Sequence, residues 1–587
     1  MAEFESDAKP ALHGPGSSGS DDDIAARSTA IKPQQRRLYD KDVSFEEYNY
    51  WAEKTREAEK SVPAPRTQWL ALMKGKRKPH DAGEDGTPIT MNLAKEENRM
   101  LISDEEWVNA SRAYRQAGWG ACFYLITTDI LGPFATPYAI GSLGYGPGIG
   151  LFTAFGLTAG YSGYLLWHVF LGVDSDQFPA RNYGDLGFRT WGTPMRHLIN
   201  FIQALALLLL LGQVTILFGA NIYELSKTQL CYIVCPLIFV LIGFFLTQIR
   251  TLKNLGIFAT LAIWLNLLVI FITMGVIAHS APDYAVAGGS SVGEGIGDIP
   301  SITPKNGIYP ALVHSAGIPT KELFGAINGL LSGVLAYAGA QLFIEFMAEM
   351  RRPRDFLKAM WSAQIFIYIV YIVYGCFVYY YQGQYTYNPS FQAVSNYAWQ
   401  SVGNVLTLLA GLIAAALYGN IGIKVFYNNI CCDLLNAPLI TSRRGKFAYA
   451  AIVPVWWSIA FVIAAAIPAY AAFVGVISAS CLLNMTYTIP PFLALGYDIQ
   501  KNAMRPLEGD GFNPVTGEVV RHGTPMQRYI RGFTSGGPIR VAQNVWHVLY
   551  FLCSLGMCGL GMWASIEAMI FAFQQPQDTS FSCKAPI

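Results

Sequence analysis

The sequence predicts an all-α integral membrane protein with eleven transmembrane helices, and three observations support this class. Only 14% of the 587 residues are charged and 52% are hydrophobic, whereas an ordinary globular protein has about 25% charged residues. The apolar residues form long uninterrupted blocks after residue 117. Lys and Arg residues gather beside alternate ends of these blocks. The net charge of +1 provides no overall field that would attract nucleic acid or an acidic partner.

A helix needs about 20 apolar residues to cross the hydrocarbon core of a bilayer. Eleven segments satisfy this length: 118–141, 146–171, 198–220, 231–249, 255–278, 323–348, 360–381, 402–427, 448–468, 470–494 and 543–573. The apolar stretch 448–494 is too long for one crossing, and Pro468 offers a turn at which it divides into two.

The positions of Lys and Arg predict that the N-terminus is cytoplasmic, because these residues are retained on the inner side of a membrane. With the N-terminus inside, the inner loops between spans carry eighteen Lys and Arg residues. The outer side carries four: Lys227, Lys305, Lys321 and Lys584. If one span were miscounted, the later Lys and Arg residues would fall on the outer side. The observed distribution therefore favours eleven spans.

The regions outside the spans differ in composition. Residues 1–100 are rich in Ser, Asp, Gly, Pro and Lys, and such a segment is expected to remain a disordered cytoplasmic tail. No segment before residue 118 has the apolar core of a signal peptide. Residues 101–117 are expected to form a short surface helix that leads into the membrane. The other predicted regions are an extracellular loop at 279–322, a cytoplasmic loop at 497–541 and an extracellular tail at 574–587.

The ten cysteines indicate small buried thiols rather than a disulfide framework or a metal site. There is no CxxC pair and no metal-ligand spacing, so the sequence predicts no metal and no cofactor. Six of the cysteines fall inside apolar segments: Cys122, Cys235, Cys376, Cys481, Cys553 and Cys558.

The first span contains a predicted break in the helix. Gly132 and Pro133 lie near the middle of the membrane, and Pro137 follows four residues later. Each proline removes a backbone donor, and unpaired backbone groups are tolerated in a membrane only where they line a cavity or contact protein. A simple kink is the alternative, and the second proline favours real unwinding.

The sixth span has a second weak point at residues 336–341, which read Ala-Tyr-Ala-Gly-Ala-Gln. Close packing of helices through small residues is the alternative explanation. However, the first and sixth spans are corresponding members of two five-helix halves, one starting inside and one outside. Interrupted helices at corresponding positions of an inverted repeat indicate a substrate site at the midplane.

The two breaks together favour a zwitterionic substrate. The half-helix that starts after Gly132 would offer the free N–H groups of Phe134 and Ala135 to a carboxylate. The carbonyl groups freed around Tyr337 and Gly339 would accept hydrogen bonds from an ammonium group. We expect Phe134 and Tyr337 to form an apolar subsite for the substrate side chain.

Two acidic residues inside the spans are candidates for proton coupling, because a charge at the bilayer centre costs at least about 2.5–3.5 kcal/mol and is seldom placed there without a role. Asp129 precedes the first break by three residues, and a structural hydrogen bond is its alternative role. Glu345 follows the second break, and an interfacial ion pair with Arg351 or Arg352 is its alternative.

The sequences around both predicted breaks resemble motifs of a known protein family. Residues 132–139 (Gly-Pro-Phe-Ala-Thr-Pro-Tyr-Ala) and the following Leu-Gly-Tyr at 143–145 resemble the first-span element of the amino acid/auxin permease (AAAP) family of the APC superfamily, in particular its fungal neutral amino acid permeases. Residues 343–353, which end in Glu-Met-Arg-Arg-Pro, resemble the sixth-span signature of that family, and the match continues through 355–359. The resemblance covers about 118–573.

The resemblance implies a five-plus-five inverted-repeat (LeuT-like) fold with one extra helix, and proton-driven uptake of amino acids. Carried over by position, the substrate-binding residues would be Ile130, Leu131, Gly132, Phe134, Ala135, Tyr337, Ala338, Gly339 and Gln341. The chain departs from the family where many relatives have small residues before the first-span glycine, since residues 129–131 are Asp-Ile-Leu and Pro133 follows the glycine directly. Both departures lie at the expected pocket, so they put the identity of the substrate in doubt.

The sequence therefore predicts a proton-coupled symporter of neutral amino acids, aromatic or large aliphatic ones among them, that works by alternating access. Its partners would be the amino acid, the proton and the lipid bilayer. We expect it in the plasma membrane, with the vacuolar membrane as the alternative. Rival hypotheses are a transporter of the same fold for another small metabolite, and a nutrient sensor with vestigial transport. A membrane enzyme is disfavoured because no cluster of His, Asp or Cys at the span ends offers a nucleophile or a metal site.

Overall fold

The computed structural model describes the membrane bundle, a short N-terminal helix and parts of the connecting loops. The described residues are 32–33, 43–61, 101–102, 115, 117–248, 252–284, 290–291, 302–304, 306–319, 323–432, 435, 437–438, 443–466, 470–505, 509–574 and 583. The expected surface helix at 101–117 and the turn at Pro468 fall largely or entirely outside these residues.

The described part of the chain is almost entirely helical, and nine of its helical stretches are long and apolar enough to cross a membrane. They are Tyr145–Val173, Thr193–Leu225, Thr260–Ile277, Leu323–Glu349, Pro353–Tyr385, Tyr397–Cys432, Arg444–Ala466, Ala472–Ala503 and Pro538–Phe571. Each coincides with one of the eleven predicted spans. The remaining two predicted spans are also helical. One is the 14-residue α10 (Val234–Thr247), and the other is divided into short pieces, α5, η1 and α6. The count of eleven crossings remains a prediction.

The bounds of the bundle elements are as follows: α5 Trp119–Ile130, η1 Pro133–Ala135, α6 Thr136–Leu143, α7 Tyr145–Val173, α8 Tyr183–Trp191, α9 Thr193–Leu225, α11 Leu252–Ile277, α12 Leu323–Ala336, η4 Ala340–Leu342, α13 Phe343–Glu349, η5 Pro353–Asp355, α14 Phe356–Gln382, η6 Gly383–Tyr385, η7 Ser390–Ala393, α15 Tyr397–Phe426, α16 Arg443–Ala466, α17 Tyr470–Ile477, α18 Ile489–Ala503 and α20 Pro538–Gln574. Three π-helical turns interrupt two of the long helices: η8 Tyr427–Cys432, η9 Ser478–Leu482 and η10 Asn484–Thr488. Helices α16 and α17 flank the predicted division near Pro468, which itself lies outside the described residues.

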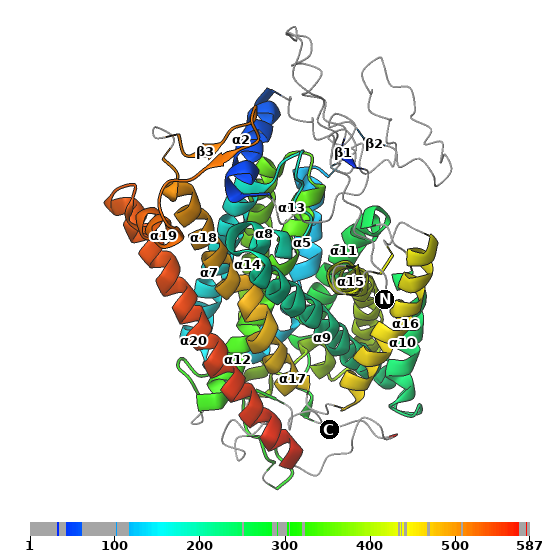
Figure 1. Ribbon diagram of the computed structural model, residues 1–587. Helices are drawn as coiled ribbons and strands as arrows, with labels where there is room; N and C mark the ends of the chain where they lie inside the picture. The colour runs from blue at the N-terminus through cyan, green and yellow to red at the C-terminus, as the bar shows by residue number, and fades with distance from the viewer. Residues whose placement is uncertain are drawn as a thin grey trace, which may run out of the picture.

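The interrupted sixth span is mostly buried, whereas the last helix, α20, lies along one edge of the bundle (Figure 1). In the apolar window of Leu323–Glu349, 78% of residues are buried, against 22% for Pro538–Phe571. Helix α20 runs along the outside of the bundle and packs on α12, α17 and α18. The most buried helices are therefore those that contain irregular backbone.

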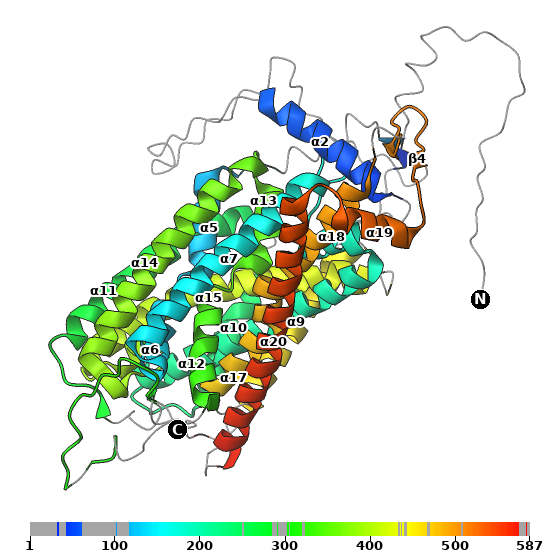
Figure 2. The same cartoon turned by 90° about the vertical axis from the view of Figure 1, so that its left-hand side faces the viewer.

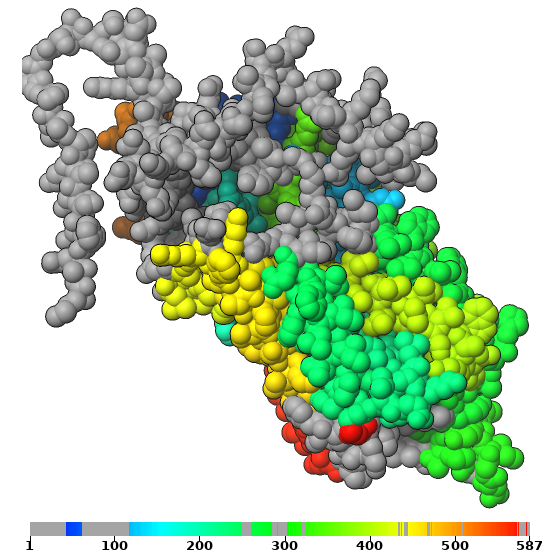
Figure 3. All heavy atoms as spheres, turned by 90° about the vertical axis from the view of Figure 1, so that its right-hand side faces the viewer, coloured from blue at the N-terminus to red at the C-terminus, as the bar shows by residue number. Residues whose placement is uncertain are grey.

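The outer faces of the peripheral helices carry large apolar side chains. Figure 3 shows the face built by α10, α11, α15 and α16. Phe245, Trp264, Phe271 and Val455 are all more than half exposed on these helices. Exposed apolar surface of this extent is expected of a protein whose surroundings are lipid rather than water.

A helix that the composition did not predict lies across one end of the bundle. Helix α2 (Phe45–Ser61) is separate from the membrane helices in Figure 2 and lies over the ends of α7 and α18. The Ser44 hydroxyl caps it by accepting a hydrogen bond from the Glu47 N–H at 3.3 Å. Its face of Phe45, Tyr48 and Ala52 is buried. The expectation of a disordered tail over residues 1–100 therefore does not hold for 45–61, because this apolar face finds a partner on the bundle.

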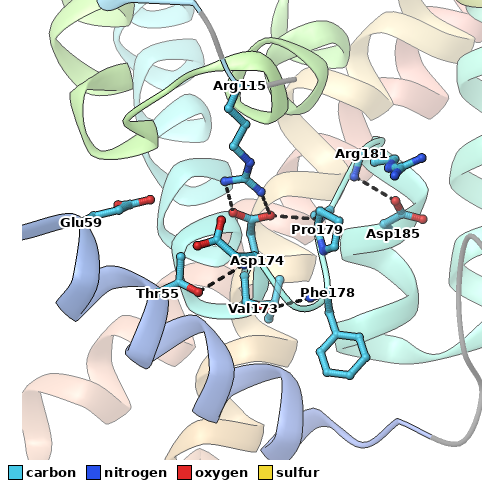
Figure 4. A network of polar contacts seen from close by, with 12 residues as sticks. Thr55, Glu59, Arg115, Val173, Asp174, Phe178, Pro179, Arg181 and Asp185 are labelled. Carbon is cyan, nitrogen blue, oxygen red and sulfur yellow. Dashed lines mark hydrogen bonds and ion pairs between the residues drawn. The ribbon is translucent and has the colours of Figure 1, made fainter. Parts of the chain in front are cut away.

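An ion-pair network joins α2 to the end of α7 (Figure 4). The carboxylate of Asp174, which is fully buried, accepts hydrogen bonds from Arg56 at 2.7 Å and from Arg115 at 2.7 and 2.9 Å. The backbone N–H of Ala180 supplies one more at 2.9 Å. Burial would raise the pKa of Asp174, but Arg115 and Arg56 outweigh burial and hold the pKa below its usual range.

Further structure occupies the segment that we expected to be a cytoplasmic loop at 497–541. Helix α18 continues to Ala503, a hairpin pairs β3 (Gly511–Phe512) with β4 (Val519–Val520), and α19 spans Pro525–Thr534. A second two-stranded pair joins β1 (Lys32–Pro33) and β2 (Leu101–Ile102). The guanidinium groups of Arg521 and Arg528 bind the buried carboxylate of Glu46 on α2, each at 2.6 Å. This segment therefore also holds α2, at its first turn.

A disulfide lies at the other end of the bundle. Cys231, just before α10, is bonded to Cys583 in the C-terminal tail. The six cysteines within apolar segments are free thiols, as expected, but Cys376 and Cys558 are only partly buried and Cys553 is exposed. Cys231 and Cys583, which are 352 residues apart in sequence, depart from the expectation because they form a disulfide. Spacing along the chain gives no sign of such a long-range bond.

Candidate functional site

The first span is interrupted where the Gly-Pro pair predicted it. Helix α5 ends at Ile130, and Leu131 and Gly132 then adopt non-helical backbone angles (φ −67°, ψ 92° and φ −147°, ψ 70°). A 3₁₀ turn starts at Pro133, before α6 resumes at Thr136. Gly132 is exposed, and a Cβ added to it would have nothing within 4 Å. The break thus borders open space, as unwound backbone in a membrane requires.

The sixth span is interrupted at the other predicted point. Helix α12 ends at Ala336, the chain turns through residues 337–339, and α13 begins at Phe343 after a 3₁₀ turn. Within the turn, the N–H of Gly339 donates to the carbonyl of Tyr337 at 2.9 Å. The structure therefore confirms that both helices lose their regular backbone hydrogen bonding within the span.

The two breaks lie against each other. A Cβ on Gly339 would collide with the Ile130 side chain and would lie 3.1 Å from the Oδ2 atom of Asp129. Only glycine permits this approach. The start of the first span also pairs with the end of the sixth, because the Ala117 N–H donates to the Glu349 carbonyl at 3.0 Å and the Arg351 N–H donates to the Ala117 carbonyl at 2.9 Å. The two spans therefore run in opposite directions.

One tyrosine hydroxyl contacts both breaks. Tyr371 on α14 is fully buried. Its hydroxyl lies 2.5 Å from the carbonyl oxygen of Ile130, the last residue of α5, and 2.9 Å from that of Ala336, the last residue of α12. The N–H of Gly132 donates to the same hydroxyl at 3.2 Å. The carbonyl ends of the two interrupted helices thus converge on a single side chain.

Asp129 lies at this convergence. Tyr418 on α15 lies close to the carboxyl group of Asp129. The Oδ2 atom of Asp129 is buried and has no hydrogen-bond partner among the described residues. Both roles that we expected for Asp129, proton coupling and a structural hydrogen bond, stay predictions.

Glu345 occupies a second polar position, beyond the break of the sixth span. The amide of Gln203 on α9 donates to Glu345 Oε1 and to the Gln341 carbonyl, both at 2.8 Å. Glu345 Oε2 and the side-chain oxygen of Gln341 are buried without a partner among the described residues. Within that part of the chain no ion pair joins Glu345 to Arg351 or Arg352, so the side chain points into the bundle.

The two aromatic residues that we expected to form one subsite have different ring neighbours. Tyr337 contacts Phe152 and Tyr371, with ring centroids 6.2 and 5.5 Å apart. Phe134 contacts Tyr374 and Phe391, at 6.1 and 5.0 Å. Their joint subsite stays a prediction.

The other predicted positions have distinct surroundings. The carbonyl of Leu131 accepts a hydrogen bond from Asn266 on α11 at 3.2 Å. Ala135 ends the 3₁₀ turn of the first span. Ala338 packs against a separate apolar cluster that includes Phe473 and Ile477 on α17. Of the predicted residues, Asp129, Ile130 and Gly339 are thus brought directly together.

Sequence reasoning missed Tyr371, Tyr418, Gln203 and Asn266. Gln203 and Asn266 are isolated amides within apolar runs, and that signal was available in the sequence. Tyr371 lies between Tyr368 and Tyr374, at three-residue spacing on one helix face. An aromatic face is ordinary packing in most helices, and only the position of the breaks gives its hydroxyl a specific role.

Comparison with known proteins identifies one matching family. A family model described as transmembrane amino acid transporter protein matches residues 115–508. The solved structure of Mhp1, titled a nucleobase-cation-symport-1 family transporter in a closed conformation with bromovinylhydantoin bound, is similar at 11% identity and a TM-score of 0.43, over 79% of this chain and 95% of that chain. No curated protein matches the chain.

Proposed function

Because the chain belongs to the transmembrane amino acid transporter family, we propose that it is a proton-coupled symporter of neutral amino acids. The family makes the chain a multi-pass membrane transporter and not an enzyme. The proton, the class of amino acid and the plasma membrane as its location are our proposals. The observation that carries the proposal is the meeting of two interrupted helices at Asp129 and Gly339.

The polarity of the breaks supports a zwitterionic substrate. The ends of α5 and α12 present carbonyl groups at Tyr371, and helix C-termini carry partial negative charge. The resumed helix after Gly132 presents the opposite pole. An α-amino group and an α-carboxylate are separated by one carbon atom, so both can reach these poles at once.

The arrangement of the chain supports an inverted repeat with the N-terminus inside. The first and sixth spans run in opposite directions, as two halves of opposite orientation require. The disulfide between Cys231 and Cys583 lies on the side that we assign to the exterior, and disulfides form in oxidising compartments. We therefore propose eleven crossings in a five-plus-five fold with α20 as the extra helix.

Asp129 and Glu345 are the proposed proton-coupling residues. Each is an acidic side chain with a buried oxygen that has no partner among the described residues. They flank the breaks on two different spans, so a change in the packing of the first span against the sixth would alter the surroundings of both.

The test is uptake of radiolabelled amino acids by the purified full chain in proteoliposomes. With an imposed inward proton gradient and no sodium, we expect a neutral amino acid to accumulate, and an uncoupler to abolish the accumulation. Uptake that is unaffected by the gradient would overturn the coupling. The absence of uptake for every amino acid tested would overturn the proposed substrate class.

A further inference from the structure

We propose that Tyr371 determines which amines the site can bind. Its single hydroxyl proton is shared between the carbonyl groups at the ends of both broken helices. The acceptors that remain without a donor then require a substrate ammonium group with at least two N–H donors. This inference rests on the proposed function. It adds a residue and a rule for which amines can bind.

A count of protons at Tyr371 supports the first step. The hydroxyl lies within hydrogen-bond distance of the carbonyls of Ile130 and Ala336 and also accepts a bond from Gly132. A tyrosine hydroxyl has only one proton to donate. At any moment, therefore, it can satisfy only one of the two carbonyl groups.

The surrounding groups add further acceptors and little positive charge. Asp129 Oδ2 is buried without a partner among the described residues, and it lies 3.1 Å from where a Cβ of Gly339 would be. The same point receives the negative ends of α5 and α12. At least two acceptors, one carbonyl and one carboxylate oxygen, thus remain for a cationic donor. Buried acceptors of this kind destabilise the folded protein when they have no partner.

An ammonium group fits this set of acceptors, and a sodium ion is the other cation that oxygen atoms of this kind would bind. We favour the ammonium group because it carries directional N–H donors that match two separate acceptors, and because the open space beside Gly132 gives room for the rest of a substrate. The two candidate cations can be distinguished by experiment, since uptake would depend on the sodium concentration only if sodium occupied this position.

The experiment compares Tyr371→Phe with Tyr374→Phe in proteoliposomes. Tyr374 is a matched control: it is fully buried on the same helix, and its hydroxyl bonds Ser390 at 2.7 Å. The probes are L-phenylalanine and its N-methyl, N,N-dimethyl and N,N,N-trimethyl derivatives. In Tyr371→Phe neither carbonyl group can accept the hydroxyl proton. The substrate ammonium group would then need three N–H donors, instead of two, to satisfy every acceptor. We expect KM for phenylalanine to rise at least tenfold, and the ratio of KM for N-methylphenylalanine to KM for phenylalanine to rise at least fivefold.

If Tyr371 had only a structural role, its substitution would raise both KM values by the same factor or lower Vmax. The ratio of KM for N-methylphenylalanine to KM for phenylalanine would then stay unchanged, and that result would overturn the proposal. Tyr374→Phe should keep the wild-type ratio. If Tyr371→Phe does not fold, the wild-type protein still decides: the dimethyl derivative, which has one N–H, should bind at least tenfold more weakly than the monomethyl derivative. Equal binding of the trimethyl derivative and the parent would overturn the inference, while uptake of phenylalanine would still support the proposed function. A requirement for sodium would overturn both the inference and the proposed proton coupling.

Discussion

The buried acidic side chains in the middle of the bundle and at its α2-covered end differ in their hydrogen-bond partners. At the covered end, the carboxylate of Asp174 is buried and both of its oxygens accept bonds from arginine, with a backbone N–H in addition. In the middle, Asp129 has a buried oxygen without a partner among the described residues, and the hydroxyl of Tyr371 is shared between two carbonyls.

The difference separates a structural network from a binding site. A buried carboxylate whose two oxygens both accept bonds from arginine, as those of Asp174 do, holds elements together, and removal of one partner is costly. A buried acceptor without a donor carries an energetic penalty that folding alone does not explain. It is therefore expected where a ligand or a proton supplies the donor during the transport cycle. The predictions below test whether the two regions differ in this way.

The largest effect is expected from Asp174→Ala at the covered end. The substitution leaves the guanidinium groups of Arg56 and Arg115 buried without their carboxylate, which costs about 3–5 kcal/mol. We expect loss of the monodisperse protein peak in size-exclusion chromatography, or a large fall in melting temperature. The control is Asp355→Ala, whose pair with the exposed Lys358 is worth about 0–1 kcal/mol. Similar melting temperatures for the two variants would contradict a structural role for Asp174.

A smaller loss of stability is expected from Gly339→Ala in the middle of the bundle. The added methyl group would collide with Ile130, and overpacking of this kind costs about 1–3 kcal/mol. Gly132→Ala is the matched comparison, because a Cβ there has nothing within 4 Å. We expect its melting temperature to stay close to that of the wild type. Equal destabilisation by the two variants would show that the breaks do not pack as tightly as described.

The next prediction concerns transport rather than stability. Asp129→Asn keeps the size of the side chain beside Tyr418, but it removes the ionisable carboxyl group. We expect accumulation driven by a proton gradient to fall at least about tenfold, equivalent to about 1.4 kcal/mol, with little change in melting temperature. Asp355→Asn, at a turn outside the breaks, should retain accumulation. Unchanged accumulation in Asp129→Asn would remove this residue from the coupling mechanism.

The sequence predicts most of the bundle because lipid imposes a simple rule on it. Apolar length places a helix at each predicted span, and Gly132-Pro133 places the first break correctly, since proline removes a backbone donor wherever it occurs. The second break has no proline, and its position follows from the small residues at 336–340 together with the symmetry of the halves. Local chemistry therefore suffices for the positions of the breaks.

Contacts between distant segments could not be predicted in the same way. Tyr371 acquires its role only because α14 lies against both breaks. Helix α2 was missed because its composition is polar and its narrow apolar face becomes meaningful only when the bundle offers a partner. The bond between Cys231 and Cys583 spans 352 residues and leaves no local pattern.

The smallest effect is expected from Glu46→Gln at the covered end, and it should depend on pH. Burial would raise the pKa of Glu46, but the hydrogen bonds and charges of Arg521 and Arg528 outweigh burial and lower the pKa. A carboxyl group with a lowered pKa in the folded state stabilises the protein above its unfolded pKa of about 4.3, and this contribution is lost as the pH falls through the folded pKa.

The glutamine side chain in Glu46→Gln would keep the shape of the carboxylate but lose its charge, at a cost of about 1–2 kcal/mol near neutral pH. The melting temperatures of the wild type and the variant should therefore differ by a constant amount from about pH 8 to about pH 5 and begin to converge as the pH falls below about 4.3. Glu53→Gln is the control, since the exposed Glu53 pairs with Lys501 at 3.4 Å and should contribute less than about 1 kcal/mol. Equal melting temperatures of wild type and Glu46→Gln near neutral pH would mean that α2 is held by shape and not by charge.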